Sequence, residues 1–256
     1  MLSLSFIFEL TRRDFSERFA GSTLGALWAL IWPLVNLFIY IVIFGRIMGS
    51  RLPGVSGIYA YGIYLTSGLI AWVAFSQIVT RCSTIFFEKK NLISKVRLSL
   101  PSLLAFVVTA ETVTYLISMV IFFLFLILTG YPLSRHLVLL PFVYLLQLIF
   151  AFGIGLLAAT LAVFLRDLKE IVGITLQLWF WFTPIVYVAD ILPAGVQKLL
   201  RFNPAYVFID AYHHMFVYNE APALRTLMVM AVIAHLMVWG SYVVFKKLEK
   251  DVRDFL

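Results

Sequence analysis

The chain has 256 residues, of which 62% are hydrophobic and 13% are charged, and its formal net charge is +7. An ordinary soluble domain is about half apolar with about a quarter of its residues charged, so this composition excludes one. Lys and Arg in a membrane chain gather in cytoplasmic loops, which accounts for the positive charge without nucleic acid as a partner. The single cysteine, Cys82, excludes an intramolecular disulfide.

The first part of the chain predicts an interface helix followed by two membrane spans. Residues 4–20 place apolar and charged residues at helical spacing, which is typical of an amphipathic helix lying in the membrane interface. A span needs about 20 mostly apolar residues, and the ranges 24–46 and 58–80 meet this requirement. Pro33 lies in the first of them, where we expect a kink with some hinge character.

The rest of the chain predicts four further spans. They are expected at 103–128, 137–164, 171–187 and 224–245. The segment 189–222 is semi-polar and its apolar pieces are too short to cross, so short re-entrant or extracytoplasmic helices are expected there. A charged tail, 246–256, follows the last span. Most of the 20 Lys and Arg residues then fall on the side of both termini, which predicts that both termini are cytoplasmic.

The fold class is therefore predicted as an all-α integral membrane protein, and motifs for chemistry are absent from its sequence. No GxxxxGK[ST] phosphate loop, HExxH zinc motif or GxSxG nucleophile turn occurs. We therefore expect no enzyme activity and no cofactor in this chain, and energy for uphill transport must come from elsewhere. His213 and His214 lack a third ligand at suitable spacing, so no metal site is expected.

Four sequence motifs follow one another along the chain in a fixed order. They are LGALWALIWPLVN at 24–36, FLRDLKEI at 164–171, FTPIVY at 182–187 and FNPAYVFIDAYHH at 202–214. In order and position they resemble the ABC-2 type permeases, especially the subfamily that exports lipid-linked polysaccharides. One departure lies after Tyr212, where the family often has an arginine and this chain has His213 and His214.

The resemblance implies one transmembrane domain over 1–256, acting as a six-span half-transporter in a bacterial cytoplasmic (inner) membrane. It implies a homodimer with two copies of a cytoplasmic ATPase subunit, which holds the ATP and Mg. The substrate would be a lipid-linked polysaccharide. O antigen is the favoured candidate, and capsule or teichoic-acid chains are the alternatives. The segment 189–222, with Asn203 and Pro204, would form the gate. The first and fifth spans would line the translocation path of the polysaccharide.

The charges of the interface helix and cytoplasmic loops are candidates for coupling to that ATPase. The residues are Arg12, Arg13, Asp14, Lys89, Lys90, Arg166 and Asp167. From physical chemistry alone, the same charges would serve equally well to fix topology.

Aromatic residues of the first and fifth spans have two explanations. Their faces can pack on sugar C–H surfaces along a path, or they can be belt and lipid-facing residues, the usual place of Trp and Tyr. The candidates are Trp28, Trp32, Tyr40, Trp179, Phe180, Trp181, Phe182 and Tyr187. Pro184, like Pro33, is a candidate kink or hinge. Tyr59, Tyr61 and Tyr64 suit a membrane–water boundary.

Glu111 lies inside the third predicted span. A carboxylate within hydrocarbon is costly and is by default a functional candidate. In the alternative, which we favour, it has a structural role and is protonated or pairs in the bundle with a hydroxyl or an amide. Export driven by ATP needs no proton relay.

Two other functions remain open on the sequence alone. An ABC-2 exporter of small hydrophobic drugs or lipids would share the fold. A polytopic lipid-sugar transferase would need acidic or His residues clustered at a membrane face. The 13 Asp and Glu residues are mostly scattered beside Lys or Arg, and no such cluster is visible.

Overall fold

A computed structural model describes residues 4–18, 20–47, 52, 55, 57–95 and 99–255. All regular secondary structure in these ranges is helical, which confirms the predicted all-α class. Among the described residues, five helices are long and apolar enough to cross a membrane. They cover Trp28–Gly45, Ala60–Glu88, Leu100–Leu128, Arg135–Ala162 and Leu224–Phe255.

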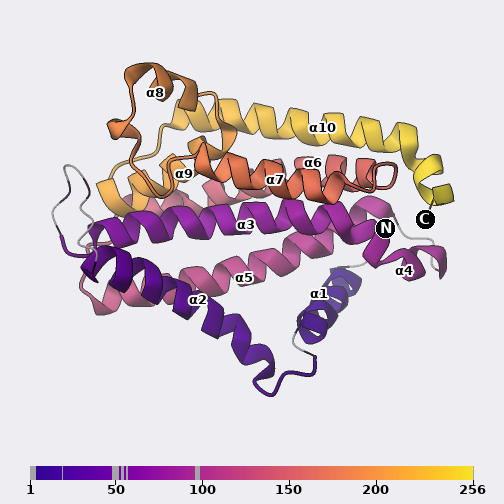
Figure 1. The fold of residues 1–256 in the computed structure, drawn as a ribbon, viewed down its shortest axis with the longest axis horizontal. Coiled ribbons are helices and arrows are strands. Elements are labelled where there is room, and N and C mark those ends of the chain that lie inside the picture. Colours follow the sequence, from indigo (N-terminus) through magenta and orange to yellow (C-terminus); the bar gives the residue numbers. More distant parts are fainter. Residues whose placement is uncertain are drawn as a thin grey trace.

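These spans correspond to labelled helices in Figure 1. The first is α2 (Trp28–Phe38) continued by the π-helix η2 (Ile39–Ile47), and the second and third are α3 (Ala60–Glu88) and α5 (Leu100–Leu128). The fourth joins η3 (Arg135–Leu139) to α6 (Leu140–Ala162), and the fifth is α10 (Leu224–Phe255). Both α3 and α10 run beyond the ranges predicted from hydropathy, because their charged ends remain helical.

The predicted fifth span, 171–187, differs from the expectation. Its helix is α7 (Leu168–Trp181), which has 14 residues and ends before the predicted range does. At about 1.5 Å per residue it is roughly 21 Å long, less than the roughly 30 Å of bilayer hydrocarbon. Pro184 explains the early end, because proline has no N–H to donate and its ring clashes with the carbonyl four residues earlier.

The long helices lie side by side along one axis, with α3 at the centre of the bundle (Figure 1). Helix α3 packs against α5, α6 and α7, and α6 packs most extensively against α10. Gly153 permits that last contact, since a Cβ atom there would lie 2.9 Å from the backbone nitrogen of Val238. Small residues at such crossings are typical of membrane helix packing.

Both chain termini lie at one end of the bundle, at the right in Figure 1. This end is called the proximal end below, and the opposite end is called the distal end. A helix was predicted at 4–20, and the structure has α1 (Leu4–Arg18) there, packed against α5. The basic connection after α3 contains α4 (Lys90–Lys95).

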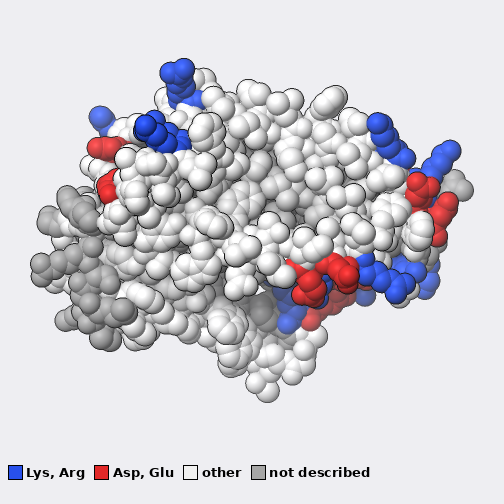
Figure 2. Space-filling model, turned by 45° about the horizontal axis from the view of Figure 1, so that its top comes forward, with Lys and Arg blue, Asp and Glu red and all other residues white. Residues whose placement is uncertain are grey.

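The segment 189–222 forms short helices at the distal end. They are η4 (Ala189–Ile191), α8 (Ala194–Leu200), α9 (Pro204–His213) and the π-helix η5 (His214–Tyr218). Figure 2 shows Lys, Arg, Asp and Glu gathered toward the two ends, with a broad uncharged surface between them. That distribution suits a molecule whose middle lies in hydrocarbon.

Candidate functional site

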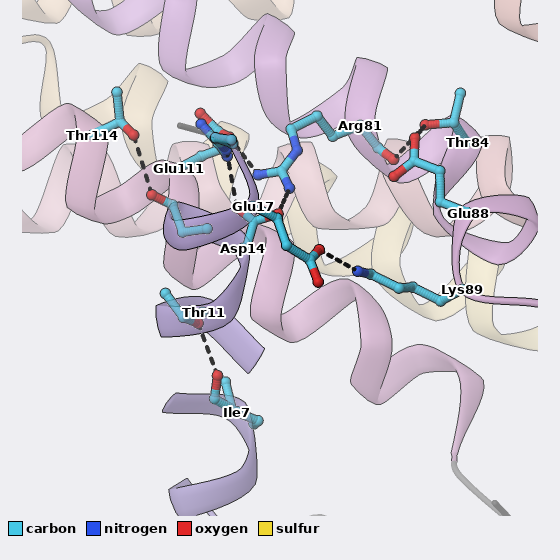
Figure 3. A network of polar contacts seen from close by, with 12 residues as sticks. Ile7, Thr11, Asp14, Glu17, Arg81, Thr84, Glu88, Lys89, Glu111 and Thr114 are labelled. Carbon is cyan, nitrogen blue, oxygen red and sulfur yellow. Dashed lines mark hydrogen bonds and ion pairs between the residues drawn. The ribbon is translucent and has the colours of Figure 1, made fainter. Parts of the chain in front are cut away.

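Four charged side chains from α1, α3 and α5 meet toward the proximal end (Figure 3). Arg81 of α3 donates hydrogen bonds to Asp14 at 2.5 Å and to Glu111 at 2.6 Å. Arg18 donates to Asp14 at 3.0 Å and also to Glu111. Each carboxylate thus binds both guanidinium groups, so the four residues form a closed charge ring with no net formal charge.

The charge ring is largely shielded from solvent. The exposed fraction of the side chain is 4% for Glu111, 10% for Asp14, 19% for Arg81 and 29% for Arg18. An unpaired charge in such a place costs several kcal/mol, and mutual pairing offsets that cost. Asp14 and Arg18 lie four residues apart, so they share one face of α1 and can both reach the bundle.

The surroundings of Glu111 differ from the expectation in one respect. Its partners are two arginines, whereas a hydroxyl or an amide was expected. Sequence reasoning missed Arg81 because it lies just beyond the predicted second span, and missed Arg18 because i,i+4 charge pairs are common on surface helices. One signal in the sequence could have indicated the pair, because Arg81 places a positive charge next to the predicted second span, the neighbour of the span that holds Glu111.

A second, more exposed connection joins α1 to the end of α3. Glu17 accepts hydrogen bonds from Arg13 at 2.7 Å and from Lys89 at 3.3 Å. The hydrogen bond from Arg13 is the main cause that lowers the pKa of the Glu17 carboxyl. The structure therefore brings Arg13 and Lys89 together at Glu17, while Asp14, a third predicted coupling residue, belongs to the charge ring.

The other four predicted coupling residues lie outside this network. They are Arg12, Lys90, Arg166 and Asp167, all of which are exposed. Arg166 and Asp167 occupy the turn between α6 and α7, while Arg12 lies on α1 and Lys90 begins α4. All four are available to a partner.

The distal end holds a non-helical stretch, 182–188, directly after α7. Tyr61 donates its hydroxyl hydrogen to the carbonyl of Val186 at 2.6 Å. The Tyr64 hydroxyl lies 3.2 Å from the carbonyl oxygen of Pro184 and 3.0 Å from that of Tyr187. The two tyrosines therefore satisfy backbone carbonyls that no helix satisfies, a role that their assignment to a membrane boundary did not predict.

Asn203 holds the same stretch from the other side. Its amide nitrogen donates to the carbonyl of Phe182 at 3.2 Å and to the hydroxyl of Thr183 at 3.0 Å. Its carbonyl oxygen accepts from the Trp179 indole at 2.6 Å and caps α9 by accepting from two backbone N–H groups. Pro204 occupies the first position of α9, where its fixed φ favours the helix.

Replacing Asn203 with alanine is expected to lower the free energy of unfolding by about 2–3 kcal/mol, since it removes a helix cap and leaves a partly buried indole N–H unpaired. Denaturant titration in mixed micelles, followed by tryptophan fluorescence, measures this loss. Asn203→Asp keeps the capping oxygen, so it should lose only about half as much free energy of unfolding as Asn203→Ala. If Asn203→Ala were as stable as wild type, Asn203 would not stabilise the protein as cap of α9 and partner of Trp179.

The predicted path residues separate into packed and exposed groups. Trp179 and Phe180 pack against Trp72, with ring centroids at 6.3 and 5.8 Å. Trp32, Trp181 and Phe182 are exposed in this single chain. The remaining candidates are less open: Trp28, Tyr40 and Tyr187 are half-buried. Exposed aromatic side chains thus lie on α2 and at the end of α7.

Two hollows lie near the residues described above. A narrow one of about 160 Å³ lies between α2, α3 and α5, and its lining includes Trp32, Pro33, Tyr40 and Glu111. It connects the first span to the charge ring. The larger hollow, of about 590 Å³, lies at the distal end among α3, α8, α9, η5 and the start of α10.

Among the described residues, no group of three or more His, Cys, Asp or Glu side chains is placed to hold a metal ion. His213 is buried and stacks on Tyr64, with ring centroids 3.6 Å apart. His214 lies instead between two carboxylates, at 3.2 Å from Glu220 and 3.6 Å from Asp210.

Comparison with known proteins adds to this geometry. The family model described as "ABC-2 type transporter" matches residues 6–217. The O-antigen export system permease protein RfbA of Myxococcus xanthus is 26% identical over 97% of this chain and 94% of its own length. The protein of the same name from Klebsiella pneumoniae is 26% identical over 99% and 97%. The polysialic acid transport protein KpsM of Escherichia coli is 24% identical over 75% and 73%.

Proposed function

Since the chain belongs to the ABC-2 type transporter family, we propose that it is the membrane subunit of an exporter of a lipid-linked polysaccharide, O antigen first of all. The observation that carries this proposal is the similarity to O-antigen export permeases over nearly the whole chain. The long apolar helices agree with a multi-pass bacterial membrane protein.

The proposed topology has six crossings of the inner membrane with both termini in the cytoplasm. In support of it, α6 ends and α10 also ends at the proximal end, so α7 must return the chain to the distal end (Figure 1). Helix α7 is short, and the stretch 182–188 completes its crossing. Irregular backbone is tolerated at membrane depth when it is buried in protein and its polar groups have hydrogen-bond partners. Tyr61 and Tyr64 provide such partners here, because their hydroxyls donate to carbonyls of this stretch.

Energy for export comes from two copies of a separate cytoplasmic ATPase, which binds ATP and Mg. The ATPase contacts α1, the connection around Lys89 and Lys90, and the turn at Arg166 and Asp167. The charge ring then transmits movement of α1 to α3 and α5, because its two arginines and two carboxylates join the three helices. Two copies of this chain place their exposed aromatic residues of α2 and α7 along the path.

Reconstitution tests this proposal. The chain is co-purified with its ATPase and placed in proteoliposomes, and ATP hydrolysis is measured with lipid-linked polysaccharide or with small lipophilic drugs. We expect stimulation by the polysaccharide. A response to the lipophiles alone would show a drug or lipid exporter, and sugar transfer by the isolated chain without ATP would show a transferase.

A further inference from the structure

The larger hollow at the distal end has no role in the export mechanism proposed above. Its volume of about 590 Å³ lies within the range of roughly 300–1,000 Å³ that is usual for small-molecule sites. Its walls come from six elements, α3, η4, α8, α9, η5 and the first turn of α10. A short saccharide fits a hollow of this size.

The walls combine planar polar groups with aromatic rings. Asp210, His214 and Glu220 form a chain of contacts, since His214 lies 3.6 Å from Asp210 and 3.2 Å from Glu220. Tyr206 and Tyr218 also line the hollow, and the ring of Tyr218 lies 5.5 Å from that of His214. Carboxylates and imidazoles can bind neighbouring sugar hydroxyls, while aromatic faces pack on sugar C–H groups.

The walls of the hollow carry more negative than positive formal charges. Three carboxylates, those of Asp190, Asp210 and Glu220, line the hollow together with one guanidinium, that of Arg201. Lys198 and Arg225 are close in sequence but are not among the lining residues.

Protonation of the remaining lining groups does not reverse this excess. Burial lowers the pKa of His213 to about 3, so its imidazole is neutral near pH 7. Burial also raises the pKa of Asp210. A proton on Asp210 would remove one negative charge, and the carboxylates of Asp190 and Glu220 would still outnumber the guanidinium of Arg201.

We propose that this hollow binds sugar units of the exported polymer and favours neutral or amino sugars over acidic sugars. The inference rests on the proposed function and adds a substrate preference to it. A carboxylate on the sugar would meet like charges in the walls, and such juxtaposition opposes binding. An ammonium group would meet carboxylates, and neutral hydroxyls would meet hydrogen-bonding partners.

The test uses the full chain in nanodiscs and three soluble probes, namely oligomers of glucosamine, of N-acetylglucosamine and of galacturonic acid. Binding is measured by saturation-transfer NMR and calorimetry. We expect the first two probes to bind at least about tenfold more tightly than the third, a difference of about 1.4 kcal/mol. Equal affinities, tighter binding of galacturonic acid, or no binding of any probe would overturn the inference.

A double variant assigns the preference to these walls. Asp210→Asn with Glu220→Gln keeps side-chain size and removes two negative charges, so the preference for glucosamine over galacturonic acid should fall about tenfold. Glu249→Gln is the matched control, because Glu249 lies near the proximal end of α10 and pairs with Lys246. An unchanged preference in the folded double variant would overturn the inference.

The two proposals fail in different ways. Export is measured as surface polysaccharide in cells that lack the permease and receive this chain with its ATPase. Absence of export with wild type would refute the proposed function. Restored export together with unselective binding in nanodiscs would refute the sugar preference alone.

Discussion

Arg81→Met is expected to lower the free energy of unfolding by about 3–5 kcal/mol, because it leaves one guanidinium to compensate two largely buried carboxylates. Glu111, with its side chain 4% exposed, keeps Arg18 as its only partner in the charge ring. Denaturant titration in mixed micelles measures the loss. Export of polysaccharide should fall with the amount of folded protein and also per folded molecule.

A double variant separates stability from coupling. Arg81→Met with Glu111→Met removes one charge of each sign and leaves the Asp14–Arg18 pair within α1. Such neutral replacements often restore stability, so we expect most of the lost free energy to return. The links that the charge ring makes from α1 to α3 and α5 are still gone, and only the exposed Glu17–Lys89 contact remains, so ATP hydrolysis should continue while export per ATP falls severalfold.

Glu17→Gln provides the control for this pair of variants. It removes an exposed connection between α1 and Lys89, and exposed ion pairs contribute only about 0–1 kcal/mol. We expect nearly normal stability and export per ATP. If the double variant also exported normally per ATP, the charge ring would have no part in coupling.

Tyr61→Phe with Tyr64→Phe is expected to lower the free energy of unfolding by about 2–5 kcal/mol, since each change leaves buried or partly buried backbone carbonyls without a donor, at a cost of about 1–3 kcal/mol for each tyrosine. The loss concerns the stretch 182–188, whose carbonyls accept from both hydroxyls. Hydrogen exchange should show faster opening of that stretch and of the last turn of α7.

Tyr59→Phe is the matched control at the same end of α3. Its ring packs edge-on against that of Phe125, with centroids 5.7 Å apart, and its hydroxyl makes no hydrogen bond to another described residue. It should leave both stability and exchange unchanged. A double variant as stable as this control would remove support for a crossing completed by irregular backbone.

Hydropathy and charge predicted the helical class, the N-terminal helix and five helices long enough to cross a membrane, because each depends on a pattern within one segment. The early end of α7 was missed, although Pro184 signals it. Hydropathy favoured a span that continued to residue 187, whereas the irregular stretch after α7 is held by Asn203, Tyr61 and Tyr64, which lie outside that segment.

The charge ring could not be derived from the sequence for the same reason. Arg81 and Glu111 are 30 residues apart, and Arg18 and Glu111 are 93 apart. Their meeting depends on how three helices pack, and no local pattern records that. Ordered motifs could indicate the family, but they carried no information on which polar residues touch.

The closed charge ring also constrains the order in which the protein is assembled during synthesis. Helix α1 leaves the ribosome before α3 and α5, yet two of its side chains bind residues of those helices. The contacts to Glu111 cannot form before the third span has been made and inserted. Helix α1 can therefore complete its part of the charge ring only after α3 and α5 have been made.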